Sequence, residues 1–292
     1  MATKAIDYYI LNVKVLPPSD NTTQRYSNLI TRWFNGGFRI KIKGDNENYY
    51  KLRKLDSIQG GEAYYGVITR YFDFERVDFT NEETGELIPY PITENAAYVR
   101  NEYEFVFLPF CHRFAFIQRG KIDDSIEKGG GVAHKKMRLV IKTAFDNGLE
   151  VGEEAIVDLS QDQYIFEEIF ENDLLALEVK VSYTNDDLNP EAKEVLDTLL
   201  RRGNIGKLWS KLSPDGTGRI DTSEVLPKGL LELAQENGQV SGRLRKEDGT
   251  IKNFDSEENP EKISEEIEDG INNYFRFLTK IINRFRERYR PL

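Results

Sequence analysis

The stretch YEFVFLPFCHRFAFIQRG, residues Tyr103–Gly120, contains two apolar runs of the length of a β-strand. YEFVFLPF is rich in aromatic and β-branched residues, which is typical of strands that pack on a half-buried surface. RFAFIQRG follows it directly and continues the sheet. The stretch therefore predicts that the first half of the chain is built around a β-sheet.

Similar runs of aromatic and β-branched residues extend upstream to Tyr8. Three further segments are predicted strands because they alternate or form short apolar runs between turn signals; they are DYYILNVKVL, GFRIKIKG and AYYGVITRYFDF. Between the first two, TTQRYSNLITRWF predicts a helix. The buried stripe of this helix would contain Tyr26, Leu29, Ile30, Trp33 and Phe34.

The second half of the chain alternates between the two kinds of element. Its predicted strands are KMRLVIKTAF, EAIVDLS, LLALEVKVSY and the short GRIDTSEV. Its predicted helices are QDQYIFEEIFEND, NPEAKEVLDTLLRRG, which Asn189 would cap, and PKGLLELAQENG. A hairpin is expected around Asp248-Gly249.

A long amphipathic helix is predicted at the end, with Asn259 as its cap and Pro260 at its first position. Apolar residues repeat along it at helical spacing: Ile263, Ile267, Ile271, Tyr274, Leu278, Ile281, Phe285 and Tyr289. The predicted fold class is α+β. Residues 1–119 would form a β-rich N-terminal domain, 120–134 a glycine-rich linker or loop, and 135–292 a mixed α/β domain ending in the long helix.

Composition limits the class of protein. The 292 residues carry a formal net charge of −10 and a single cysteine, which excludes an internal disulfide framework. The N-terminus lacks the pattern of a signal peptide, and no apolar run is long enough to span a membrane. We expect a cytoplasmic protein without a membrane partner.

Residues Ser213–Glu224, SPDGTGRIDTSE, come close to the pattern of a calcium loop. Asp215, Asp221 and Glu224 occupy ligand positions, and Gly218 stands where such a loop turns sharply. However, Ser213 replaces the usual first aspartate, and no second loop pairs with this one. A turn at Asp215-Gly216 explains the same residues without an ion.

A set of three residues matches the chemistry of metal-dependent nucleases. Glu178 and Lys180 are two apart on a predicted strand and so share a face, and Asp158 is near the end of the preceding strand. Two carboxylates can bind Mg²⁺ while the lysine orients a water molecule. The alternative is that Glu178 and Lys180 alternate on a solvated face of an edge strand.

Other catalytic chemistry has little support. Cys111, His112 and His134 do not have the spacing of a zinc site, and His112 is expected at a strand end or in the core. No phosphate-binding glycine motif is present. No cofactor is therefore expected.

Basic residues gather in four clusters. They are Lys135, Lys136, Arg138 and Lys142; Arg201, Arg202, Lys207 and Lys211; Arg243, Arg245 and Lys246; and Arg284, Arg286, Arg288 and Arg290. Residues 255–269, by contrast, carry eight acids and one lysine. Such segregation would allow an acidic protein to present a phosphate-binding groove. Solvated faces and favourable helix ends explain the clusters equally well.

The order of elements in the second half resembles the RexA-type phage-exclusion proteins and bacterial proteins of similar length among mobile elements and defence genes. The likeness covers roughly residues 100–285. It lies in YEFVFLPFCHRFAFIQRG, in LALEVKVSYTNDDLNPEAKEVLDTL, in GRIDTSEVLPKGLLELAQENGQVSGRLRKEDGTIKNFDSEENPEKI and in the terminal helix. It implies a dimer-forming, two-domain DNA-binding protein that responds to phage infection without a catalytic centre.

Three functional hypotheses follow. In the first, a non-enzymatic homodimer of antiphage or mobile-element biology binds nucleic acid, DNA rather than RNA, through a basic groove. Lys135, Lys136, Arg138, Arg201, Arg202 and Lys207 would line this groove, with Arg243 and Arg245 as further contacts. The second hypothesis is a Mg²⁺-dependent nuclease using Asp158, Glu178 and Lys180. The third is an interaction module whose acidic face docks a partner protein.

Overall fold

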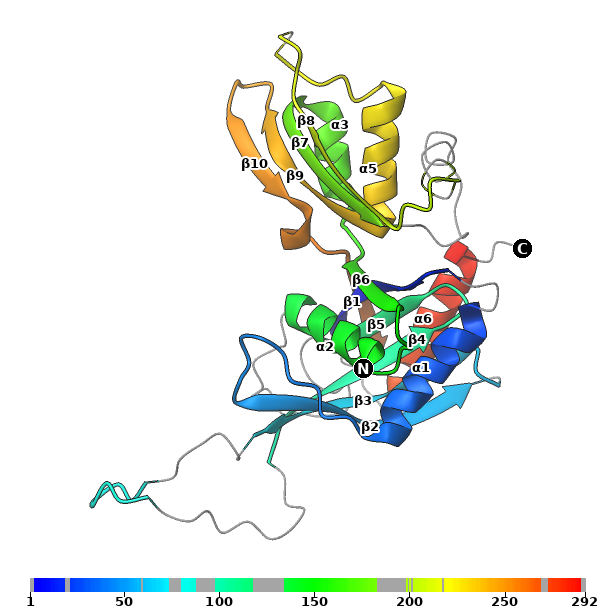
Figure 1. The fold of residues 1–292 in the computed structure, drawn as a ribbon, viewed down its shortest axis with the longest axis vertical. Helices are drawn as coiled ribbons and strands as arrows, with labels where there is room; N and C mark the ends of the chain where they lie inside the picture. Colours follow the sequence, from blue (N-terminus) through cyan, green and yellow to red (C-terminus); the bar gives the residue numbers. More distant parts are fainter. Residues whose placement is uncertain are drawn as a thin grey trace.

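The protein is described here by a computed structural model that covers residues 3–18, 22–58, 60–73, 80–87, 98–117, 134–182, 198, 200, 202–216, 218–268 and 273–289. Within these residues the chain forms two separate antiparallel sheets, each with helices packed against it (Figure 1). The fold is therefore α+β, as predicted. The expected glycine-rich linker, apart from His134, and most of the helix expected from Asn189 lie outside the described residues.

The first sheet has seven strands in the order β11-β1-β5-β4-β3-β2, and β6 also pairs with β1. Their bounds are β1 Thr3–Leu16, β2 Asn48–Ile58, β3 Ala63–Phe72, β4 Val99–Leu108, β5 Arg113–Ile117, β6 Glu154–Leu159 and β11 Lys262–Glu268. The long strand β1 joins the sheet together. Its first residues pair with β11 and its last residues with β6, while its middle pairs with β5.

Helices cover both faces of the first sheet. They are α1 Thr22–Gly36, α2 His134–Asp146 and α6 Asn273–Tyr289. Helices α1 and α2 share one core with Leu11, Val13 and Val15 of β1, and α6 forms another with Tyr8 and Ile10. Because β5 lies between the two cores, all five of its residues are buried. A strand covered on both faces reads as a continuous apolar run, which explains the run FAFI that follows Arg113.

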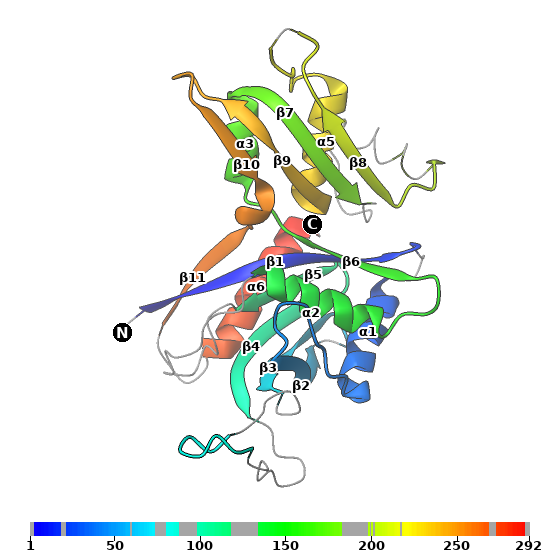
Figure 2. The ribbon, with the colours of Figure 1, turned by 60° about the vertical axis from the view of Figure 1, so that its left-hand side comes forward.

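The second sheet has four strands in the order β10-β9-β7-β8. Their bounds are β7 Asp173–Ser182, β8 Lys207–Leu212, β9 Gly238–Arg245 and β10 Ile251–Asp255. Helices α3 (Gln163–Glu171) and α5 (Val225–Asn237) lie together against one face of it (Figures 1 and 2). The described helices leave the opposite face of this sheet uncovered (Figure 2).

The boundary between the two sheets differs from the expected domain boundary. Helix α2, strands β6 and β11 and helix α6 were expected in a C-terminal domain, but all of them pack on the first sheet. The second sheet is therefore formed by a segment inserted between β6 and β11. Figure 2 shows the chain leaving the first sheet at β6 and returning to it along β11.

Several predicted elements are confirmed. Helix α1 buries Tyr26, Leu29, Ile30 and Trp33 and half-buries Phe34, as its stripe predicted. The strands at β1, β3, β6 and β7, helix α3 and the hairpin of β9 and β10 also form where expected.

The predicted strand KMRLVIKTAF is wrong, because this segment is helix α2. Its buried residues are Met137, Val140, Ile141, Ala144 and Phe145. Their spacing of three and four places them on one face of a helix, and this face packs on the first sheet. The segment also contains the β-branched residues Val140 and Ile141, which are more typical of strands.

The predicted start of the terminal helix is also wrong. Asn259 ends the 3₁₀ turn η2 (Ser256–Glu258), and Pro260 forms an isolated bridge with Gln161. The following residues form β11, in which Ile263 pairs with Tyr8. A spacing of four between isoleucines fits a helix and also keeps them on one face of a strand. The helix α6 begins only at Asn273, and it buries Leu278, Ile281 and Phe285 as predicted.

Two predicted short strands are reduced to single bridges, Ile40 with Tyr50 and Ile220 with Leu174. Conversely, β2 and β8 were not predicted. The unpredicted strand β8 matters for function, because it forms part of the uncovered face of the second sheet.

Candidate nucleic-acid interface

Strand β8 projects three side chains away from the core. Lys207, Trp209 and Lys211 are exposed, and they alternate with half-buried Leu208, Ser210 and Leu212. Because successive side chains of a strand point to opposite faces, the three exposed residues form a row on the face opposite α3 and α5. Trp209 has 63% of its surface exposed.

Trp209 is held in place by charged neighbours on this face. It pairs across strands with Lys180 of β7, and its indole N–H donates a hydrogen bond of 2.9 Å to Oε1 of Glu178. The Nζ atoms of Lys180 and Lys211 lie 5.2 and 5.1 Å from the centre of its ring. This is within the range of cation–π attraction. The ring is therefore oriented but still open to solvent.

Glu178 is the acidic member of this cluster. Its carboxylate lies 3.0 Å from Lys211 Nζ and 3.6 Å from Lys180 Nζ. The hydrogen bond from Lys211 holds the pKa of the Glu178 carboxyl below its usual range, and Trp209 and Lys180 contribute in the same direction. Glu178 is thus ionised at neutral pH, and it partly neutralises two lysines.

Strands β9 and β10 extend the same face. Gln239 pairs with Lys180, and Ser241 pairs with Glu178. Arg243 is paired with Ala176 on one side and Asn253 on the other. We call this surface the open face; it consists of Lys207, Trp209, Lys211, Ala176, Glu178, Lys180, Gln239, Ser241, Arg243 and Asn253.

Arg243 is the cation of the open face that is most available to a ligand. It is exposed, and it makes no ion pair with any residue that the structure describes. Arg245, two positions further, lies 4.0 Å from Asp173, which also takes Arg219 at 3.2 Å. Part of the charge of Arg245 is therefore offset.

The basic groove predicted from the sequence is divided between the two sheets. Lys135, Lys136 and Arg138 lie on α2 against the first sheet, whereas Arg243 and Arg245 belong to the second. Lys135 pairs with Glu258, and Arg138 pairs with Glu257. The bond to Glu258 raises the pKa of Lys135, as expected for an engaged cation.

The second predicted cluster is also altered. Lys207 contacts both carboxylate oxygens of Glu154 at 2.7 Å, and Arg202 is exposed without an ion pair to the described residues. Arg201 and Arg290 lie outside the described residues.

The acidic run 255–269 is therefore not segregated in space. Besides Glu257 and Glu258, its Glu261 pairs with Arg288 of α6 at 2.8 Å. These acids neutralise basic residues that lie far away in the sequence. The first sheet consequently loses much of the charge segregation that the sequence suggested.

The three residues of the nuclease hypothesis are separated. Glu178 and Lys180 share a face, as predicted. The carboxylate of Asp158, however, contacts Lys14 and Ser182, both at 3.1 Å. Ser182 lies four residues beyond Glu178 on β7, or about 13 Å along the strand. Ligands of one Mg²⁺ would have to lie about 4 Å apart, so Asp158 and Glu178 do not form one metal site.

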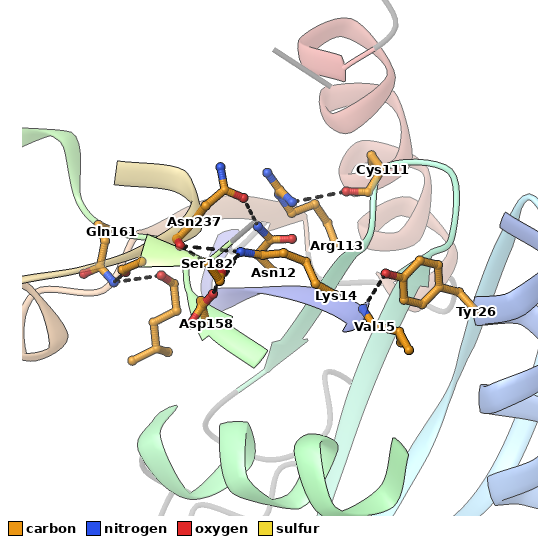
Figure 3. Close-up of polar contacts among 12 residues, drawn as sticks. Asn12, Lys14, Val15, Tyr26, Cys111, Arg113, Asp158, Gln161, Ser182 and Asn237 are labelled. Carbon is orange, nitrogen blue, oxygen red and sulfur yellow. Dashed lines mark hydrogen bonds and ion pairs between the residues drawn. The ribbon is translucent and has the colours of Figure 1, made fainter. Parts of the chain in front are cut away.

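Asp158 belongs instead to a buried polar cluster where the two sheets meet (Figure 3). Lys14 of β1 is 1% exposed and bonds Ser182 of β7, whose hydroxyl donates to Asp158. Asn12 donates to the Asn237 side chain at 2.9 Å. We call Asn12, Lys14, Asp158, Ser182 and Asn237 the junction cluster.

The junction cluster follows from the alternation of β1. Leu11, Val13 and Val15 face the core beneath α1 and α2, so Asn12 and Lys14 face the other way. There they meet the second sheet instead of water. Ser182 continues the row of Glu178 and Lys180, so this contact fixes one end of the open face against the first sheet (Figure 3).

The calcium-like loop makes turns within the described residues. Asp221 accepts hydrogen bonds from the backbone N–H and hydroxyl of Ser223, and Glu224 precedes helix α5. In the described part of the chain no group of three or more His, Cys, Asp or Glu residues could hold a metal ion. Asp215 lies in a bend, and the contacts of Asp221 and Glu224 are those of a local turn and a helix start.

The two histidines are placed apart. His112 is 3% exposed in the turn between β4 and β5, as predicted for a core histidine. His134 stacks on Tyr9 with 5.7 Å between ring centres. Cys111 is buried.

Sequence reasoning missed Trp209. The only local signal is in KLWSKL, where Lys207 and Lys211 each lie two positions from Trp209 and alternate with Leu208 and Leu212. Such alternation predicts a strand with Lys207, Trp209 and Lys211 on one face.

The fold and the site together define an α+β protein in which a four-stranded sheet, with one face open, is inserted into a larger sheet. A family model described as a domain of unknown function (DUF4747) matches residues 4–283, and the chain belongs to this family. Among curated proteins, none matches the chain. None of the described helices has both the length and the apolar content that crossing a membrane requires.

Proposed function

We propose that this protein binds nucleic acid through the open face and does so without a catalytic centre of its own. The observation that carries the proposal is the exposed Trp209 with Lys180 and Lys211 beside it and Arg243 further along the same face. Exposed aromatic rings among cations on an uncovered sheet are suited to nucleic acid.

The charge of the open face supports this proposal. It carries the cations Lys180, Lys207, Lys211 and Arg243 and the acid Glu178, and Asp255 lies beside Ser241 at its edge. Phosphate groups that replace Glu178 or Glu154 as partners of the lysines would release counterions, so affinity should fall with salt. The formal net charge of −10 makes this dependence shallower, because salt also screens the long-range repulsion between the ligand and the rest of the protein.

The biological setting is proposed on the resemblance in layout to the RexA-type proteins. It would be phage exclusion or the biology of mobile elements, with DNA as the ligand and a homodimer as the assembly. The same resemblance implies action by binding, which agrees with the separation of Asp158 from Glu178.

The test is binding of labelled DNA to the full chain over a salt series, with Mg²⁺ added in a parallel set. We expect binding that weakens steeply with salt and leaves the DNA intact. Arg243→Glu should weaken it at least tenfold at about 50 mM salt. Lys54→Glu makes the same charge change on the first sheet, where Lys54 is exposed and only 3.7 Å from Asp56, and should have a small effect.

Equal losses in the two variants would contradict the proposal, because a general field effect would then explain the binding. Absence of binding at low salt would also contradict it and would direct attention to a protein partner. Cleavage that requires Mg²⁺ would restore the nuclease hypothesis.

A further inference from the structure

The ring of Trp209 is placed where a base could stack on it. Its neighbours across the sheet are polar, with Gln239 beyond Lys180 and Ser241 beyond Glu178. The ring remains 63% exposed although three charged groups contact it. A planar group can therefore approach it from solvent without moving the backbone.

We propose that the open face takes single-stranded nucleic acid, with one base stacked on Trp209 and the adjoining phosphates bound by Lys180 and Lys211. This inference rests on the proposed function and specifies its ligand. In a duplex the faces of the bases are covered by their neighbours, so a ring on a flat sheet could contact only the backbone. In a single strand each base offers a face to an aromatic ring.

The positions of the cations agree with a strand that crosses the sheet. Arg243 lies two strands away from Trp209 and four residues further along, which corresponds to roughly 16 Å between their backbones. Stacking at Trp209 would thus anchor one nucleotide, and Arg243 would bind a phosphate further along the strand. Stacking does not depend on base identity, so little sequence preference is expected.

The orientation of the ring adds to the argument. Its N–H is bonded to Glu178, so a ligand would use the face of the indole, over which the Nζ atoms of Lys180 and Lys211 now lie. The lysine Nζ atoms near the ring are at the ends of flexible side chains that can turn to phosphates. Glu178 then keeps the ring in place while the lysines change partners.

The intrinsic tryptophan fluorescence of the protein can report on stacking. The protein has two tryptophans, and Trp33 is only 1% exposed in the first core. Stacking should therefore quench the emission of Trp209 and leave that of Trp33 nearly unchanged. Trp209→Phe removes the reporter while it retains a ring that can stack.

The experiment compares wild type, Trp209→Ala, Trp209→Phe and Arg243→Glu in the full chain. The probes are labelled oligo(dT), oligo(U) and a mixed-sequence DNA duplex of equal length. We expect wild type to bind single strands more tightly than duplex. Trp209→Ala should weaken single-strand binding about tenfold or more, and Trp209→Phe should restore most of it. Urea unfolding followed through Trp33 verifies that each variant is folded.

The outcomes separate this inference from the function on which it rests. If Arg243→Glu weakens binding while Trp209→Ala does not, the protein binds nucleic acid and the stacking inference is overturned. Preference for the duplex overturns it too. If wild type binds none of the probes, the proposed function fails and the inference fails with it. The oligo(dT) and oligo(U) arms distinguish DNA from RNA as the single strand.

Discussion

Trp209 and Glu178 lie on neighbouring strands, and the indole N–H of one donates a 2.9 Å hydrogen bond to the carboxylate of the other. The same carboxylate forms ion pairs with Lys211 and Lys180. One acid therefore orients the ring and offsets the charge of two lysines. Its two roles can be separated by substitution.

Glu178→Gln should bind nucleic acid more tightly than wild type, by roughly two- to fivefold at low salt. The amide oxygen can still accept the hydrogen bond from Trp209, but the negative charge beside Lys180 and Lys211 is removed. Fluorescence anisotropy with a labelled single strand measures the change. Glu83→Gln, which removes one exposed charge on a distant turn, serves as the control. Weaker binding by Glu178→Gln would contradict the expectation.

Arg243→Ala should lower the slope of log affinity against log salt by about one, because one phosphate contact is removed. Arg138→Ala should leave that slope unchanged, since Glu257 already engages Arg138. Affinities measured at four or more salt concentrations give both slopes. The reverse result, with the slope reduced only in Arg138→Ala, would favour the groove predicted on α2.

Lys14→Met should reduce the free energy of unfolding, toward the lower end of about 3–5 kcal/mol. Lys14 is 1% exposed, and its loss leaves the Asp158 carboxylate, 21% exposed, without its ion pair. The double variant Lys14→Met, Asp158→Asn should recover at least half of the loss, because the uncompensated charge is gone. Urea unfolding measures all three proteins.

The exposed pair Lys54–Asp56 provides the control for that experiment. Its side chains are 63% and 47% exposed, so Lys54→Met should change stability by no more than about 0.5 kcal/mol. If Lys14→Met also lowers the free energy of unfolding by no more than about 0.5 kcal/mol, the junction cluster contributes little to stability.

His112 should make the fold sensitive to acid. Burial, with smaller effects from the charges of Arg113 and Lys14, lowers its pKa from 6.5 to about 3. The unfolded chain therefore binds a proton that the folded chain does not. The free energy of unfolding that depends on neutral His112 is fully present above pH 6.5 and is lost as the pH falls toward 3. About 2 kcal/mol of it is lost between pH 7 and pH 5.

The measurement is urea unfolding at pH 7 and pH 5 for wild type and His112→Asn. Asparagine tolerates the positive φ of 58° at this position better than most residues. The variant should be less stable than wild type at pH 7 but should lose less stability on acidification. Identical losses in both proteins would show that other groups control the acid response.

Part of the candidate site was open to sequence reasoning. Glu178 and Lys180 were predicted to share a face, and they do, because alternation along a strand is a local property. The predicted grouping of Lys135 with Arg202 and Lys207 had no local pattern behind it, because these residues are far apart in the sequence. Whether a lysine meets a phosphate or a glutamate depends on residues far away in the chain. Arg138, for instance, meets Glu257 across 119 positions.

Within several elements the sequence by itself determined which residues share a face. The stripe of α1, the alternation of β7 and the hairpin at Asp248-Gly249 all depend on neighbours a few positions apart. Only the tertiary structure decided that β11 pairs with β1 and that the second sheet is inserted between β6 and β11. The isoleucine spacing of β11 is compatible with a helix or a strand, and the edge offered by β1 selects the strand. The open face likewise depends on which side α3 and α5 cover, because burial is a property of the assembled sheets and helices.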